Sequence, residues 1–294
     1  MAYQHDQWKG DTGGTPWMQR TLIRWFRHTD LRIPYFCMGW MVPFYMLKNH
    51  CEYLASYHYF RRCWGHGPLK AFWNVYCQQF RFGQVIVDRF AMFAGKTFHI
   101  EVDRQELFDA LESGDKGFVQ LSCHMGNYEL AGYSLTPKHK RFFALVFQGE
   151  TETVMRQRQH MFETGRVTMV PVQEDLSHIF TLSGELENGN IVSMPGDRIF
   201  GSPRYVECEL LGRKARLPLG PFALAAQREA PMLAVFVMKE GTTRYRIYVR
   251  EVSDEAQTTG KEKANAMART FAAHMGEMIR KYPHQWFNFY EFWD

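Results

Sequence analysis

The residues most able to do chemistry lie in the segment LSCHMGNYEL, residues 121–130. His124 follows an apolar run that is typical of a buried strand. Gly126 and Asn127 can turn the chain into a helix that has Glu129 in its first turn. A carboxylate bonded to one imidazole nitrogen fixes the tautomer, so the other nitrogen can remove a proton from a hydroxyl group. The pattern indicates the histidine–carboxylate half of a triad, in which an acceptor hydroxyl attacks in place of an enzyme nucleophile.

Spacing and direction refine this hypothesis. Residues five apart do not share a helix face, so His124 and Glu129 can meet only through the turn between them. Cys123 should point to the side of the strand opposite His124, which argues against a Cys–His pair. Backbone N–H groups near Gly126 and Asn127 could stabilise an oxyanion. The alternative interpretation of His124 is a structural histidine with its hydrogen bonds satisfied.

The elements that must position this motif change in type near Gly95. Before it, apolar residues recur at helical spacing; after it, short β-type runs alternate with helical ones. The expected strands cover 98–102, 117–124, 141–147, 167–172, 190–196 and 232–238, with a hairpin over 205–218 and an exposed strand over 245–252. The expected helices cover 103–114, 127–135, 152–164, 175–188, 219–229 and 261–281, the first with a capping pair of Asp103 and Glu106.

This alternation predicts an α/β fold with a central, largely parallel mixed sheet flanked by helices and an N-terminal helical extension. We expect residues 1–95 to form a membrane-proximal extension and residues 96–294 to form the α/β domain. With no linker between them, the two should make one integrated unit. The stripe of Met267, Phe271, Met275 and Met278 in the last helix should lie in the core.

Composition limits the partners. A net charge of +4 does not indicate nucleic acid, but it suits anionic lipid, coenzyme A or an acidic carrier protein. The six cysteines lack zinc-ligand spacing, so we expect no metal. We also expect no secretory signal. The apolar segment 33–47 contains Pro43 and is short for a membrane span, which favours an interfacial or re-entrant segment over a buried hairpin or a spanning helix.

Four segments resemble one enzyme family. HMGNYE resembles the HxGNWE form of the HxxxxD/E motif in the bacterial lipid A biosynthesis acyltransferases, within the lysophospholipid acyltransferase superfamily. The segments GNIVSMPGDRIFGSPR (189–204) and LLGRKARLPLGPFALAAQREAPMLAVFV (210–237) are similar to later family segments, in the same order. The ending HQWFNFYEFW resembles the aromatic ending of the family. The resemblance implies a glycerol-3-phosphate acyltransferase-like fold.

The resemblance also implies roles for individual residues. His124 matches the general base, Glu129 the acid that orients it, and Gly126 and Asn127 the turn of the motif. Asp197 matches a further active-site acid, and the adjacent Arg198 could bind phosphate. The family also has an arginine between these motifs, and Arg156, Arg158 or Arg166 could match it. Of these, Arg158 and Arg166 are taken as the substrate-binding candidates.

The implied function is transfer of a fatty acyl chain from an acyl carrier protein or coenzyme A thioester to a hydroxyl of a lipid or glycolipid. No cofactor beyond the thioester co-substrate is expected. The lack of a clear N-terminal span predicts a peripheral or monotopic enzyme at the cytoplasmic face of the inner membrane. The loop PGDRIFG differs from the Asp-Gln or Asp-His pair of the lipid A enzymes, which leaves the acceptor open. A non-catalytic lipid-binding module and a thioesterase of the same fold are the alternatives.

Overall fold

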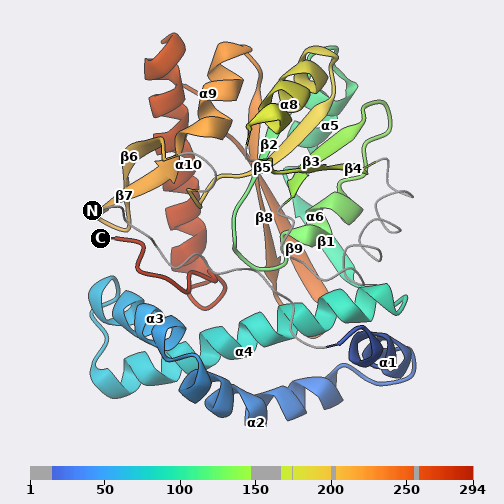
Figure 1. Cartoon of the computed structure of the whole chain (residues 1–294), viewed down its shortest axis with the longest axis vertical. Helices are drawn as coiled ribbons and strands as arrows, with labels where there is room; N and C mark the ends of the chain where they lie inside the picture. The colour runs from blue at the N-terminus through green and yellow to red at the C-terminus, as the bar shows by residue number, and fades with distance from the viewer. Residues whose placement is uncertain (1–14, 147–166, 174, 200–202, 255–257, 294) are drawn as a thin grey trace. The chain divides into compact units, whose positions relative to one another are not determined.

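The computed structural model describes residues 15–146, 167–173, 175–199, 203–254 and 258–293 (Figure 1). These residues form two compact units. The first holds the described residues up to Lys96 together with Asn288–Glu291. The second holds Thr97–Val146 and the described residues from 167 to 287, with 292 and 293. The expected helix over 152–164 lies outside the described residues.

The first unit contains the expected N-terminal helices. They are α1 (Pro16–Phe26), α2 (Arg32–Lys48), α3 (His50–Arg62) and α4 (Pro68–Phe93). Prolines begin α1 and α4, where the missing N–H group has no intrahelical partner to lose. The apolar segment 33–47 is one continuous helix with Pro43 inside it, so the buried-hairpin alternative is wrong. Among the described residues, no helix is both long and apolar enough to cross a membrane.

The second unit is built on a seven-stranded sheet in the order β1-β9-β8-β2-β5-β3-β4. The strands are β1 (His99–Asp103), β2 (Phe118–Ser122), β3 (Phe142–Val146), β4 (Val167–Pro171), β5 (Ile191–Pro195), β8 (Met232–Lys239) and β9 (Arg244–Glu251). Strands β8, β2, β5, β3 and β4 run parallel to one another. Strand β9 is antiparallel to β8 and carries β1 parallel to itself. The predicted largely parallel mixed sheet is confirmed.

Helices cover both faces of this sheet. Figure 1 shows α9 (Leu219–Gln227) and α10 (Gly260–Lys281) on one side, and α5 (Gln105–Ser113) and α8 (Ser177–Glu187) on the other. The hairpin of β6 (Tyr205–Leu210) and β7 (Arg213–Pro218) is separate from the large sheet and packs on α10. The predicted core stripe of α10 is confirmed, because its four members, Met267, Phe271, Met275 and Met278, are buried.

Two local predictions are wrong. The strand at 245–252 is not exposed, because β9 lies between β1 and β8 and buries residues such as Tyr245 and Ile247. Asp103 does not cap α5; it ends β1 and pairs with Arg250 on β9, at 2.7 Å. The residue before α5 is Arg104, which takes a left-handed conformation (φ 60°) and makes no side-chain cap. Cross-strand pairing therefore prevails over the local capping signal.

Candidate active site

The register of β2 and β5 brings two distant residues together. These strands are adjacent and parallel, and Ser122 is the register partner of Pro195. His124 and Asp197 each lie two residues beyond this pair, at the carboxyl edge of the parallel strands, where open α/β sheets place their ligands. Between them, Gly196 donates its N–H to the Ser122 carbonyl at 2.8 Å. A Cβ on Gly196 would lie 2.9 Å from the ring of Phe271, so a larger residue does not fit there.

Asp197 holds His124 at two points. Its Oδ1 lies 2.8 Å from Nδ1 of the imidazole, and its Oδ2 accepts the backbone N–H of His124 at 2.9 Å. The carboxylate side chain is 3% exposed and the imidazole 21% exposed. The second imidazole nitrogen, Nε2, has no hydrogen-bond partner in the described part of the chain. A hydroxyl group that reaches this nitrogen would meet a ring whose orientation is already set.

The electrostatic surroundings keep this pair in the form that a general base needs. Burial lowers the pKa of His124, the positive charge of Arg198 lowers it further, and Asp197 only partly opposes them. Burial by itself would raise the pKa of Asp197, but the contacts with His124 and the charge of Arg198 lower it overall. The stable state near neutral pH is therefore an ionised Asp197 beside a neutral His124.

The prediction that Glu129 orients the imidazole needs correction, because Asp197 is the residue at Nδ1. Glu129 is buried in the first turn of α6 (Glu129–Ser134), as the sequence indicated for its position. Proximity in sequence favoured Glu129, whereas the lateral pairing of β2 with β5 supplies Asp197. The sequence signal for Asp197 was the GDR segment directly after an expected strand.

The turn residues are where the sequence placed them, but their backbone N–H groups are already used. Gly126 donates to the carbonyl of Gln285 at 2.8 Å, and Asn127 donates to that of Val237 at 2.9 Å. The expectation that these N–H groups bind an oxyanion is therefore corrected. Gly126 has a φ of 54°, and a Cβ there would lie 1.9 Å from the Val237 carbonyl oxygen. Only glycine fits this turn.

Two other polar groups are associated with this part of the site. The Nδ2 of Asn127 is buried and has no hydrogen-bond partner in the described residues. Arg198 donates to the carbonyl of Phe287 at 3.0 Å and is close enough to act on the pKa of His124. The candidate arginines 156, 158 and 166 lie outside the described residues. The buried thiol of Cys123 has a pKa well above its usual value because of desolvation, consistent with its exclusion as a nucleophile.

A feature that the sequence did not reveal is the contact between the C-terminal segment and the His124 turn. Phe287 donates its N–H to the His124 carbonyl at 2.9 Å, and Trp286 pairs with Met125 in an antiparallel bridge. All backbone polar groups of His124 thus have partners. The aromatic run was a signal of burial, but aromatic residues alone do not say which strand end they contact. Among the described residues, no group of three His, Cys, Asp or Glu side chains could hold a metal ion.

A histidine–aspartate pair at the carboxyl edge of an open α/β sheet, with one imidazole nitrogen available, is the arrangement that general-base catalysis of group transfer requires. The model of the family described as "Bacterial lipid A biosynthesis acyltransferase" matches residues 81–294. The chain therefore belongs to this family and is an enzyme of the acyltransferase class. The resemblance in the four sequence segments is confirmed.

Known proteins similar to this chain include two from Mycobacterium tuberculosis, each named phosphatidylinositol mannoside acyltransferase. The one from strain ATCC 25618 / H37Rv is 25% identical over 182 residues, and the one from strain CDC 1551 / Oshkosh is 24% identical over 182 residues. Each match covers 60% of this chain and 57% of the relative, so the chain spans little more than half the length of these curated relatives. A crystal structure of the 1-acyl-sn-glycerophosphate acyltransferase PlsC from Thermotoga maritima has a TM-score of 0.43 and 12% identity, covering 85% of this chain and 98% of that one.

Proposed function

We propose that this protein transfers a fatty acyl chain from a thioester of acyl carrier protein or coenzyme A to a hydroxyl of a lipid or glycolipid. The observation that carries the proposal is the available Nε2 of His124, on an imidazole held at Nδ1 by the buried Asp197. No enzyme nucleophile is needed, since the acceptor supplies the attacking oxygen.

The reaction follows from this geometry. Nε2 of His124 removes the proton of the acceptor hydroxyl as its oxygen attacks the thioester carbonyl, and Asp197 stabilises the imidazolium that forms. The carbonyl oxygen becomes an oxyanion, for which the Asn127 side-chain amide and the Arg198 guanidinium are the donors we propose. When the intermediate collapses, the C–S bond breaks and the ester forms. The sulfur leaves as a thiol, taking the proton held by His124.

The first test is thiol release from palmitoyl-coenzyme A and from palmitoyl-acyl carrier protein, with and without a total lipid extract. We expect release to require both lipid and His124, so that His124→Ala loses activity while its folding, followed by circular dichroism, is unchanged. His274→Ala is the matched control, because His274 is on the surface of α10 and bonds only the Glu251 carbonyl, at 3.0 Å. His124-dependent release that needs no lipid would identify a thioesterase, and no release from either donor would favour a lipid-binding module.

We further propose that α2 docks on an anionic membrane. Its outward side carries large apolar residues that are 38–80% exposed, namely Ile33, Phe36, Trp40, Met41, Phe44, Tyr45 and Leu47. Such a contiguous apolar surface is unusual on a protein that meets only water. Described residues 15–49 contain five Lys and Arg but one Asp, which suits anionic headgroups. Amphipathic rings such as that of Trp40 fit the membrane interface.

Vesicle sedimentation tests this docking. Replacing Phe36, Trp40 and Phe44 together by serine should weaken binding to phosphatidylglycerol-containing vesicles by about 10-fold or more, since apolar area no longer leaves water. Phe180→Ser is the control, because Phe180 is also highly exposed, at 80%, but lies on α8 in the other unit. Equal binding by both variants would contradict this surface.

A further inference from the structure

Strand β8 has an edge that β2 covers only in part. The pairing of β2 with β8 ends at Leu121 and Ala234, yet β8 continues to Lys239. Beyond that point the edge is taken up by the His124 turn, because Gly126 forms a parallel bridge with Val237. Backbone polar groups that are buried without partners are costly, so the remaining groups of β8 need partners from elsewhere.

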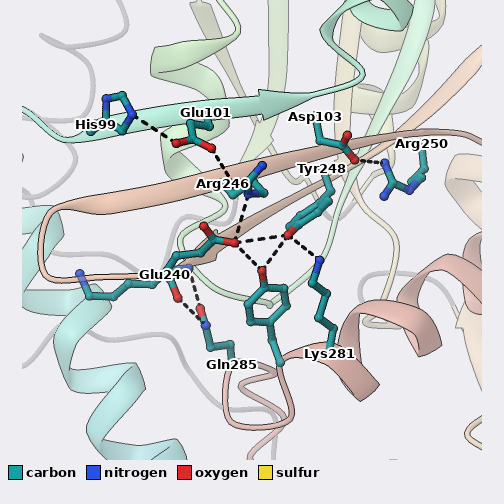
Figure 2. A network of polar contacts seen from close by, with 11 residues as sticks. His99, Glu101, Asp103, Glu240, Arg246, Tyr248, Arg250, Lys281 and Gln285 are labelled. Carbon is teal, nitrogen blue, oxygen red and sulfur yellow. Dashed lines mark hydrogen bonds and ion pairs between the residues drawn. The ribbon is translucent and has the colours of Figure 1, made fainter.

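Gln285 supplies those partners at the end of β8. Its Oε1 accepts the N–H of Lys239 and its Nε2 donates to the carbonyl of Lys239, each at 2.8 Å. Figure 2 shows this side chain reaching the strand end from the segment after α10. Gln285 is 5% exposed and Lys239 is 2% exposed, so water does not compete for these bonds. The amide group thus replaces a neighbouring strand at this position.

The backbone of Gln285 also contacts the His124 turn. Its carbonyl accepts the N–H of Gly126 at 2.8 Å, and the next two residues pair with Met125 and His124. One residue therefore joins the end of β8 to the turn that carries His124. The residue holds neither the reacting atoms nor the imidazole itself.

The segment before Gln285 is hydrogen-bonded near the turn between β8 and β9. The hydroxyl of Tyr282 donates to Glu240 at 2.7 Å, and the N–H of Gln285 donates to the Tyr282 carbonyl at 3.0 Å. Figure 2 shows Glu240 also bonded to Arg246 and Tyr248 of β9. This polar cluster fixes where the chain leaves α10, and so fixes the approach of Gln285 to Lys239.

We propose that Gln285 is a positioning residue for His124, acting through the Gly126 turn. The inference deepens the proposed acyl transfer and rests on it. Without the Gln285 amide, the 285–287 segment would lose its anchor on β8, and the His124 carbonyl and Gly126 N–H would lose a partner of defined position. The Nε2 of His124 would then sample orientations that do not meet the acceptor hydroxyl.

Gln285→Met tests this role, because methionine has a similar length but forms neither bond to Lys239. With palmitoyl-coenzyme A and lipid extract, kcat should fall about 10- to 100-fold, with KM for the thioester nearly unchanged. Hydrogen exchange in peptides that cover 124–127 should become faster. The control is Lys140→Met, which removes partly buried hydrogen bonds at the opposite ends of the strands and should lower Tm without changing kcat or this exchange.

Unchanged kcat in Gln285→Met, or an equal loss of kcat in Lys140→Met at a similar loss of Tm, would overturn the positioning role. If the wild type shows no release dependent on lipid and His124, the proposed function fails, and exchange at 124–127 decides the question alone. Faster exchange in Gln285→Met but not in Lys140→Met then supports positioning of the turn, and unchanged exchange overturns it.

Discussion

At the amino edge of the parallel strands, the ammonium of Lys140 donates to the carbonyls of Gly114, Lys116 and Gly189, at 2.6–3.0 Å. Gly114 and Lys116 lie just before β2, Lys140 lies just before β3, and Gly189 lies just before β5. Nearby, one oxygen of the buried Glu112 accepts the N–H groups of three successive residues, 138–140. We call this group the amino-edge clamp. The three N–H donors of the Lys140 ammonium are all used, so this ammonium has no donor left for a substrate.

At the carboxyl edge, two of these strands, β2 and β5, hold the Asp197–His124 pair. Buried charge again gathers backbone groups, because Asp197 accepts the His124 N–H. Here, however, Nε2 of His124 has no partner among the described residues, and it is on a ring with a lowered pKa. Burial of charge does not by itself mark a catalytic site. A group with unused hydrogen-bonding capacity, held in a fixed direction and with a shifted pKa, is a candidate for that role.

After the loss of His124 itself, the largest effect should come from removing the charge of Asp197. Asp197→Asn keeps the shape but loses the anion that stabilises an imidazolium, so kcat should fall about 10³- to 10⁴-fold, as for the aspartate of a serine-protease triad. Thiol release measures this, and Tm should change little. Asp103→Asn, on a partly exposed ion pair of β1, is the control. If Glu129→Gln lost more activity than Asp197→Asn, the roles assigned to the two acids would have to be exchanged.

Substitution of one glycine at each edge should distinguish effects on stability from effects on activity. Gly126 (φ 54°) and Gly189 (φ 82°) both have left-handed backbones, and a Cβ would lie 1.9 Å from the Val237 oxygen or 2.8 Å from the Asp115 oxygen. Both Gly→Ala variants should lose about 1–3 kcal/mol of unfolding free energy. Only Gly126→Ala should also lose activity per folded molecule, about 100-fold, because it displaces the His124 turn. Denaturant unfolding and thiol release measure the two effects, and equal activity losses would contradict the comparison.

Lys140→Met should affect the amino edge alone. It leaves three carbonyls without the buried ammonium as donor, so the unfolding free energy should fall by about 2–4 kcal/mol. Activity per folded molecule should stay at the wild-type level, since the clamp lies at the strand ends opposite His124. Lys138→Met is the control, because Lys138 takes part in the clamp through its backbone N–H, and its side chain is exposed. A large loss of kcat in Lys140→Met would show that the two edges are coupled.

The sequence could predict most of the second unit, because long apolar runs such as 232–238 and helical stripes such as that of α10 are local patterns. It also placed His124, Gly126 and Asn127 at a turn beyond a strand. It could not assign the partner of His124, since that depends on β2 and β5 being neighbours in register across some seventy residues of chain. For the same reason it did not foresee that Gln285 and Val237 use the N–H groups of the turn. Strand register and long-range backbone pairing leave no mark on local composition.

The smallest effect we expect concerns the electrostatics of the carboxyl edge. A neutral His124 is required as the base, so kcat/KM should fall as the pH drops through its pKa, which lies below the ordinary value of histidine. Arg198 contributes to that lowering, so Arg198→Gln should raise the pKa of His124 and move the acidic limb of the profile to higher pH. Arg198→Lys retains the charge and should leave the limb near its wild-type position, although it loses the geometry of the bond to the Phe287 carbonyl. If both variants moved the limb equally, that bond, rather than the charge of Arg198, would be what sets the pKa of the base.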